Sequence, residues 1–373
     1  MPTLSFNDSK FVKTGEFAEA IAKWYSHQAP TYSVALSIGS EEDLVTAVKL
    51  ATDHNIPFLA TGGRHGYGST LGNLQDGLAL DLSPLNNMTT DAAAETLAVG
   101  PGIKLSDVFD PVFNAGYEIL TLGGGIGRQT GAHGLMLDAL LSTRIVTASG
   151  EVLETSSTLN PDLFWAIWGA GQNFGILTSA TYQLHPVSST FTTVDLVFDA
   201  DLHVALFKEL TRFDISAEWA MAAMISWNDD DGQPAVIVSC IPWNELTTQT
   251  AFDNDAEICI RGSVHDIYGI FVFRIMEKFY ESNPVASRSA VLFEVWANQA
   301  AVAVPDYETA YPWRDAEVHV SARDAVAAMG REARAALADK SGYDELTVYV
   351  NYAKGDEALE QIYGAKNCLV WQR

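Results

Sequence analysis

Thr61-Gly62-Gly63-Arg64-His65-Gly66 is the stretch that decides the fold, because it places three glycines and a histidine in one loop directly after a short apolar strand. That strand is predicted over residues 57–61, and the amphipathic helix before it begins at the capping box Ser40-Glu41-Glu42-Asp43. Two more glycine clusters follow, at residues 123–131 and 169–175. Glycines let a backbone approach a ligand closely, and phosphate is a common ligand of such loops. The three clusters therefore predict an anion-binding site in the first half of the chain.

Two side chains in these loops add to this hypothesis. Arg64 and Arg128 would bring positive charge to an anion in an otherwise acidic protein. His65 is placed to react, because an imidazole among glycines can face a ligand and is nucleophilic near neutral pH. Two alternatives stay open at this point: the glycines only make tight turns, and His65 only hydrogen-bonds its own loop.

Strands and helices alternate through the rest of the first half. Asn160 and Pro161 have the residue types of a helix N-cap and first helical position. Strands are predicted at residues 78–82, 96–99 and 144–148, and helices at residues 105–115 and 162–168.

The second half has a different pattern. Alternating strands and intervening helices predict a second domain, an antiparallel sheet with helices on one face. A helix over about residues 323–338 and a strand over 346–352 would lead back to the first domain. The strands of the second domain are predicted at residues 192–198, 235–239 and 290–296.

Composition and charge exclude several classes of partner. The chain has 373 residues and a formal net charge of −25, which repels nucleic acid phosphates and anionic lipid heads. DNA, RNA and membrane surfaces are therefore excluded as partners. No stretch reaches the ~18 apolar residues of a membrane span. We expect a cytoplasmic protein, or a secreted one if the N-terminus is incomplete.

Familiar motifs for metals and other cofactors are missing from the sequence. Cys240, Cys259 and Cys368 lie far apart without a CxxC pair, which supports neither a disulfide framework nor a zinc site. The eight histidines include no HExxH pair, so no metal site is predicted. Gly125-Ile126-Gly127 lacks the third glycine of the dinucleotide fingerprint, which argues against an NAD-type Rossmann domain.

Taken in order, the motifs resemble the FAD-linked oxidases of the vanillyl-alcohol oxidase superfamily. The berberine-bridge-like branch, and its fungal secondary-metabolism members in particular, is the most similar. The resemblance covers about residues 30–364. It rests on residues 61–66, residues 122–127 with Arg128, Gly134-Leu135-Met136-Leu137-Asp138, Asn160-Pro161-Asp162-Leu163-Phe164-Trp165, residues 171–176 and Tyr349-Val350-Asn351-Tyr352.

The resemblance implies an α+β fold in which a two-subdomain, PCMH-type FAD-binding domain is joined to a substrate domain. The FAD-binding domain would span residues 1–188. The substrate domain, an antiparallel sheet covered by helices, would span residues 189–322. Residues 323–373 would return to the FAD-binding domain.

The resemblance also implies that the cofactor is FAD, with His65 bonded covalently to the 8α carbon of the flavin. Such a bond makes the flavin a stronger oxidant and prevents its loss. By the same resemblance, the cofactor would be held by Thr61, Gly62, Gly63, Arg64, His65, Gly66, Gly123, Gly124, Gly125, Gly127, Asn173, Gly175, Ile176 and Asn351.

The implied reaction is the oxidation of a small organic metabolite by hydride transfer to flavin N5, with molecular oxygen reoxidising the cofactor to give hydrogen peroxide. Tyr352 is the first candidate for the base and Tyr349 the second. A tyrosine with an ordinary pKa of ~10 would need a nearby cation or hydrogen bonds to act at neutral pH. The alternative that both tyrosines pack a core stays open.

The chain departs from the family pattern in three places. Residues 116–121 run directly into Leu122 where the family has further glycines and often a cysteine, so a second, cysteinyl flavin bond is excluded. The joint after Cys240 looks compressed, and residues 365–373 do not match the usual closing helix. Two other functions therefore stay open: a shortened binding or scaffolding remnant, and a flavin-bearing cyclase without net redox change. Trp227, Trp243, Phe293 and Trp296 are possible aromatic pocket walls, or core.

Overall fold

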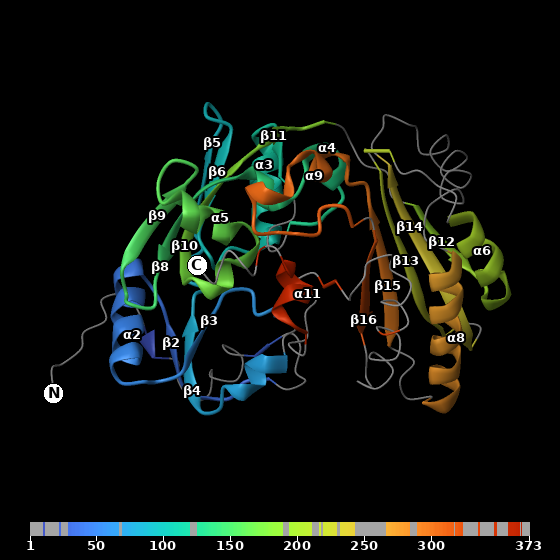
Figure 1. Ribbon diagram of the computed structural model, residues 1–373, viewed down its shortest axis with the longest axis horizontal. Coiled ribbons are helices and arrows are strands. Elements are labelled where there is room, and N and C mark those ends of the chain that lie inside the picture. Colours follow the sequence, from blue (N-terminus) through green and yellow to red (C-terminus); the bar gives the residue numbers. More distant parts are fainter. Residues whose placement is uncertain are drawn as a thin grey trace.

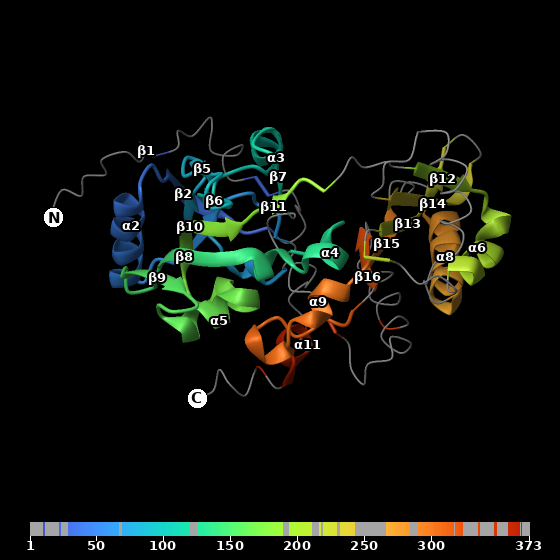
Figure 2. The ribbon, with the colours of Figure 1, turned by 90° about the horizontal axis from the view of Figure 1, so that it is seen from above.

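The computed structural model contains three main sheets, one two-stranded ribbon and the helices that cover them (Figure 1). The strands and helices of the first half form two adjoining sheets, and the third sheet stands apart with its own helices (Figures 1 and 2). The structure describes residues 10–11, 22–23, 29–66, 69–119, 125–188, 194–210, 216–217, 219–229, 232–242, 266–283, 289–316, 318–323, 335, 347–348, 357–365 and 367.

The first sheet forms because three short apolar strands pair in parallel around a crossover helix. β2 (Tyr32–Ser37) and β3 (Phe58–Thr61) flank β4 (Gly77–Asp81), and β1 (Lys10–Phe11) adds an antiparallel edge. Helix α2 (Glu41–Asp53) begins where the sequence predicts, since the Asp43 amide donates to Ser40 Oγ at 3.2 Å. Its apolar face is buried in a cluster with Leu36, Leu80 and Val146.

The second sheet is antiparallel, with strand order β5-β6-β10-β8-β9. Its core packs against α3 (Leu105–Asn114) and α5 (Pro161–Ala170), with Leu97 and Phe164 among the buried residues. A ribbon of β7 (Tyr117–Glu118) and β11 (His185–Pro186) lies beside it. The remaining bounds are β5 (Met88–Asp91), β6 (Thr96–Val99), α4 (Thr130–His133), η2 (Met136–Ala139), β8 (Leu140–Val146), β9 (Val152–Ser156), η3 (Gly171–Asn173) and β10 (Ile176–Gln183), with η1 (Ser69–Asn73) after β3.

The third sheet confirms the predicted antiparallel domain with helices on one face. Its order is β12-β14-β13-β15-β16, and α6 (His203–Leu210) and α8 (Asp266–Ser282) cover its outer face (Figure 1). Phe207, Phe273 and Phe293 are fully buried between these helices and the sheet. The other elements of this half are β12 (Val194–Phe198), η4 (Ala200–Leu202), β13 (Trp219–Asn228), β14 (Gln233–Pro242), β15 (Ala290–Trp296), α9 (Gln299–Ala303), η6 (Asp306–Glu308), β16 (Val318–Arg323) and α11 (Leu359–Tyr363).

Residues 297–316, which we call the excursion, leave the third sheet between β15 and β16 and carry α9 and η6. The excursion packs against the first half of the chain: α9 contacts α4, and Trp165 Nε1 donates to Tyr307 O at 2.9 Å. α9 and α11 lie between the second and third sheets in both views (Figures 1 and 2). The two halves are thus joined by packed segments as well as by chain connections.

Three sequence-based expectations differ from the structure. Arg323, placed at the start of a helix, ends strand β16, because Val318–Arg323 pairs with β15. Phe293 and Trp227 belong to the core under α6 and α8, with Trp227 5.4 Å from the Tyr280 ring, so neither is a pocket wall. Cys240 is disulfide-bonded, contrary to the expectation drawn from the wide spacing of the three cysteines. Trp243 lies outside the described residues.

A cluster of titratable groups joins the β7–β11 ribbon to α4. His133 Nε2 lies 3.1 Å from Glu118 Oε1, and the His133 and His185 rings stack at 4.0 Å. Burial lowers the pKa of His185 below its ordinary value, and the nearby His133 adds to this, while Glu118 opposes it. For Glu118 burial acts to raise the pKa, but hydrogen bonds from His133 and Ser188 outweigh it, so that pKa is also lowered.

Acidification should therefore destabilise the protein through this cluster. His185 has a lower pKa folded than unfolded, so the unfolded chain binds more protons as pH falls from about 6.5, and stability is lost. We expect the melting temperature to fall between about pH 7.5 and pH 5.5, and to fall less in His185→Phe. An equal fall in both proteins, measured by differential scanning fluorimetry, would contradict this assignment.

Candidate functional site

The first glycine loop, residues 62–66, follows β3 and is held to the neighbouring strand by an ion pair. Arg64 Nη2 donates to Asp81 Oδ1 at 3.0 Å, at the end of β4. The Ser83 hydroxyl and amide also donate to Asp81, at 2.9 and 3.2 Å. Arg64 has φ of +62°, a conformation in which a non-glycine residue is uncommon. The Arg64 side chain therefore fixes the loop, and part of its charge is matched by Asp81.

His65 lies on the exposed side of this loop. A Cβ atom at Gly63 would meet within 4 Å only the His65 ring itself, and one at Gly66 only Leu71 Cδ1 at 3.4 Å. Within the described ranges, a Gly-to-Ala substitution at either position would bring the new Cβ within 4 Å of no further residue. Thr61, the last residue of β3, is buried instead, with its Oγ1 unpaired. The loop thus presents His65 and backbone outward.

The opposite flank of the loop is closed by the turn Gly100-Pro101-Gly102, which follows β6. A Cβ at Gly62 would lie 2.4 Å from the Pro101 carbonyl oxygen, so loop and turn pack backbone to backbone. A Cβ at Gly102 would be equally close to the backbone, because it would lie 2.3 Å from Leu82 O. The Gly-Pro-Gly sequence directly after β6 was the available signal, but nothing in it specifies a contact with residue 62.

The second glycine cluster is described only from Gly125, because Gly123 and Gly124 lie outside the described residues. The Met136 amide donates to Gly125 O at 2.9 Å, and Gly125 has φ of +97°. The Gly127 amide donates to Thr130 Oγ1 at 2.9 Å. Met136 packs in one cluster with Ile103, which follows the Pro101 turn. Met136, whose amide holds Gly125, therefore belongs to the same apolar cluster as the residue that follows the Pro101 turn.

The third cluster lies at the start of β10. A Cβ at Gly175 would lie 2.4 Å from Val146 O, and Ile176 begins the strand paired with Val146. Asn173 Nδ2 donates to Ala170 O at 3.1 Å and to the Tyr363 hydroxyl at 3.2 Å. Gln172 Nε2 also donates to this hydroxyl. Tyr363, on α11, is a buried partner that sequence reasoning missed, since it lies 190 residues from Asn173.

Tyr349, Asn351 and Tyr352, the predicted base candidates and their neighbour, lie outside the described residues. Their roles stay predictions. The end of β3 and the start of β10 meet near the junction of the first two sheets, because the Leu82 amide donates to Thr61 O at 2.9 Å and Leu82 packs in one cluster with Val146 and Ile176. The structure holds Gly125 and Gly127 instead by contacts with Met136 and Thr130.

The inner face of the third sheet supplies further polar groups that sequence reasoning missed. Phe293 and Val295 face α6 and α8, so Glu294 and Trp296 point to the other face by strand alternation. Glu294 is paired in register with Ala222 on β13 and with His319 on β16. The alternation of Glu294 with the apolar Phe293 and Val295 could have indicated a strand with one polar face. It could not have indicated which part of the protein that face lies against.

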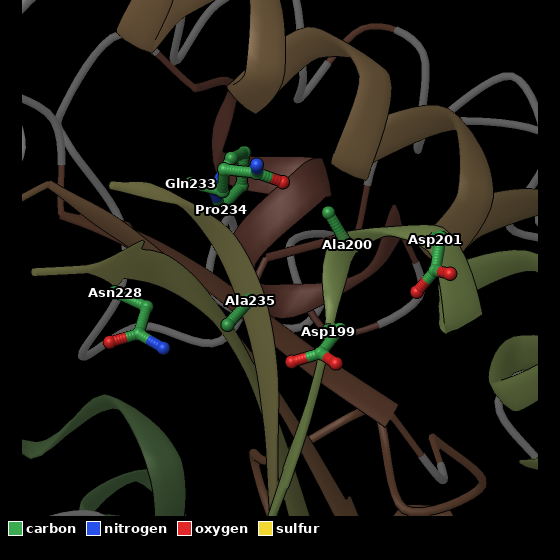
Figure 3. Close-up of a pocket in the computed structure, with 7 residues that line it drawn as sticks. All are labelled: Asp199, Ala200, Asp201, Asn228, Gln233, Pro234 and Ala235. Carbon is green, nitrogen blue, oxygen red and sulfur yellow. The ribbon is translucent and has the colours of Figure 1, made fainter. Parts of the chain in front are cut away.

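A pocket of about 480 Å³ opens elsewhere, at the edge of the third sheet formed by η4 and the β13–β14 turn (Figure 3). Its lining contains none of the residues predicted to bind the cofactor, and α6 beside it lies on the outer side of the sheet (Figure 1). It is therefore not the glycine-loop site. The pocket is lined by Asp199, Ala200, Asp201, Asn228, Gln233, Pro234 and Ala235.

Among the described residues, no group of three or more His, Cys, Asp or Glu side chains is arranged to hold a metal ion. No helix in the described part of the chain is both long and apolar enough to cross a bilayer.

Comparison with known proteins identifies the family. A protein-family model with the description "FAD binding domain" matches residues 32–156 of the sequence. The matched residues include the first glycine loop, the Pro101 turn and the second glycine loop. FAD-linked oxidoreductase srdI of Neurospora crassa is 40% identical over 417 residues, covering 95% of this chain and 83% of that protein. The chain belongs to the FAD-linked oxidoreductase family. The predicted resemblance to this family, its fungal members included, and the prediction of a flavin enzyme are confirmed.

Solved structures of FAD-linked oxidoreductases and their neighbours confirm the predicted fold class. Physcomitrella patens BBE-like 1 superposes with a TM-score of 0.81 at 18% identity, covering 98% of this chain and 93% of that one. A glucooligosaccharide oxidase from Acremonium strictum, described with a 6-S-cysteinyl, 8α-N1-histidyl FAD, superposes with a TM-score of 0.77 at 19% identity, covering 98% and 93%. These identities support the shared fold only.

Proposed function

We propose that this FAD-linked oxidoreductase oxidises a small organic metabolite, with FAD bonded to His65 and molecular oxygen as the electron acceptor. The observation that carries the proposal is the exposed His65 in a glycine loop whose other flank is closed by Pro101. An exposed imidazole in a cofactor-binding loop can face the flavin, and its ring nitrogen is nucleophilic near neutral pH. Bound there, FAD would supply hydride acceptance from the substrate and reoxidation by oxygen to hydrogen peroxide.

The chain's own residues fit this cofactor. Gly63 and Gly66 are exposed and carry no side chain that would obstruct a ligand, and hydrogen bonds of Gly125 and Gly127 hold the second loop's backbone. Arg64 orders the first loop through Asp81. A single covalent bond is proposed, because Cys240, on β14, is already disulfide-bonded and no cysteine lies near residue 122 in the sequence.

Proton removal from the substrate is proposed for Tyr352, with Tyr349 as the second candidate. Glu294 is a third candidate for the base, because it lies on the inner face of the third sheet. A small substrate bound against that face would contact β13, β15 and β16. A cytoplasmic location also stays a proposal, and the Cys240 disulfide favours the secreted alternative.

A spectrum of the purified protein tests the proposal. We expect flavin absorbance between about 350 and 500 nm that stays with the acid-precipitated chain, as a covalent cofactor must. Peroxide should accumulate under oxygen once a substrate is found. A colourless protein that FAD does not reconstitute would contradict the proposed function.

One observation favours a second candidate, a remnant that binds partners without catalysis. The alignment to the Neurospora crassa relative spans 417 residues for a chain of 373, so that relative contains segments missing here. A remnant would show no change of melting temperature with added FAD, whereas a true site should raise it. Product analysis with and without oxygen separates an oxidase from a flavin-bearing cyclase.

A further inference from the structure

One buried ion pair connects the excursion to the second glycine loop. Arg314, whose side chain is 1% exposed, donates from Nη1 to Asp138 Oδ2 at 2.9 Å and from Nη2 to Asp138 Oδ1 at 2.7 Å. The same guanidinium donates to Ala301 O at 3.2 Å and Thr309 Oγ1 at 3.0 Å. Arg314 therefore ties both ends of the excursion to a carboxylate that belongs to the FAD-binding half.

Asp138 passes this restraint to the glycine loop through η2. Its Oδ2 accepts the Leu135 amide at 2.9 Å, which fixes the start of η2. The next amide, that of Met136, donates to Gly125 O at 2.9 Å. A Cβ at Gly125 would lie 2.8 Å from the Met136 nitrogen, so loop and η2 are in direct backbone contact. Any shift of η2 must therefore displace Gly125.

Apolar packing acts on the same loop from the same side. Ile126, between Gly125 and Gly127, packs in a cluster with Leu135 and with Ala301, Tyr311 and Trp313 of the excursion. α4, which follows the loop, is equally close: a Cβ at Gly131 would lie 2.4 Å from Ala297 Cβ. The second glycine loop is thus clamped by the excursion through one polar contact and one apolar cluster.

We propose that Arg314 is a positioning residue for FAD: through Asp138 and η2 it sets the conformation of the second glycine loop, so that the substrate domain's excursion controls cofactor affinity. This inference rests on the proposed function, because it assumes that the loop at Gly125 holds FAD. A guanidinium suits the role, since its two parallel hydrogen bonds fix the orientation of the carboxylate as well as its distance.

Affinity has to be measured where FAD binds reversibly, so the test uses His65→Ala as the parent protein. FAD is titrated into cofactor-free parent, Arg314→Met, Arg314→Lys and Asp138→Asn, with flavin fluorescence as the readout and the melting temperature of each free protein recorded alongside. We expect Arg314→Met and Asp138→Asn to weaken FAD binding by roughly tenfold or more, because a small displacement of a binding loop is costly. Arg314→Lys should recover part of the loss, since it keeps the charge without the bidentate geometry.

Tyr280→Phe is the matched control for general destabilisation. It removes a buried hydrogen bond to Ser289 O, 2.6 Å long, in the core under α8 and away from the glycine loops. It should lower the melting temperature without changing FAD affinity. The double variant Arg314→Met/Asp138→Asn should weaken binding little more than either single change, because both break the same contact.

The outcomes separate the two proposals. Arg314→Met and Asp138→Asn proteins that melt at lower temperature but bind FAD as the parent does would overturn the positioning role and leave the proposed function standing. If Arg314→Met does not fold, Asp138→Asn alone decides, since its amide keeps the shape of the side chain. A parent and wild-type protein that both fail to bind FAD would instead overturn the proposed function.

Discussion

Replacing His65 with alanine should leave a folded protein whose entire flavin content is released on denaturation. In the wild type we expect the yellow colour to remain with the acid-precipitated chain. His65 is the exposed imidazole of the first glycine loop, and the loop is held by Arg64 and Asp81 independently of it. The variant should therefore keep a site that binds FAD reversibly, with a melting temperature close to that of the wild type in its cofactor-free form.

His54→Ala provides the matched control. His54 is also exposed, but it is the C-cap residue of α2 and belongs to none of the glycine loops. Its loss should leave flavin covalently attached. Covalent flavin that persists in His65→Ala, detected as absorbance of the precipitate or as a mass shift of the chain, would show that another residue is the anchor.

Gly62→Ala should damage both stability and cofactor binding. The added Cβ would lie 2.4 Å from the Pro101 carbonyl oxygen, a backbone atom that cannot rotate away. Loop and turn must separate, which we expect to cost at least about 2 kcal/mol of unfolding free energy, as for other overpacked sites. Because Gly62 belongs to the loop that is predicted to hold FAD, the same shift should reduce flavin incorporation severely.

Gly171→Ala tests whether the effect is specific. A Cβ there would meet nothing closer than Ile167 Cγ2 at 3.6 Å, and φ of −54° suits any residue. It should be neutral or slightly stabilising, because alanine loses less backbone entropy than glycine on folding. Denaturant unfolding and the flavin-to-protein absorbance ratio would measure both variants. Equal behaviour of Gly62→Ala and Gly171→Ala would refute the close approach.

Local features of the fold could be predicted because they depend on neighbours in sequence. Ser40 caps α2 through the predicted contact, and α5 begins at Pro161 after Asn160. Even so, the Asn160 amide does not cap the helix by a side-chain hydrogen bond but donates to Glu154 O at 2.7 Å. Strand positions followed from apolar runs and turn residues in the same way.

Contacts between distant segments could not be predicted. Nothing local indicates that Pro101 meets Gly62, or that Tyr363 accepts hydrogen bonds from residues 172 and 173. The aromatic side chains show the same limit: the sequence left pocket wall and core open for Phe293 and Trp296, and only the packing of α6 and α8 places Phe293 in the core. The spacing of the glycines predicted the loops of the site, whereas the residues that pack against these loops could be found only in the folded structure.

The excursion has a consequence for protein engineering by domain exchange. A graft that replaces the third sheet by that of a relative and keeps the host's residues 125–138 would pair a foreign 297–316 segment with a native η2. Recombination boundaries for new substrate specificities should therefore carry both segments from one parent, even though the linear order of the gene separates them.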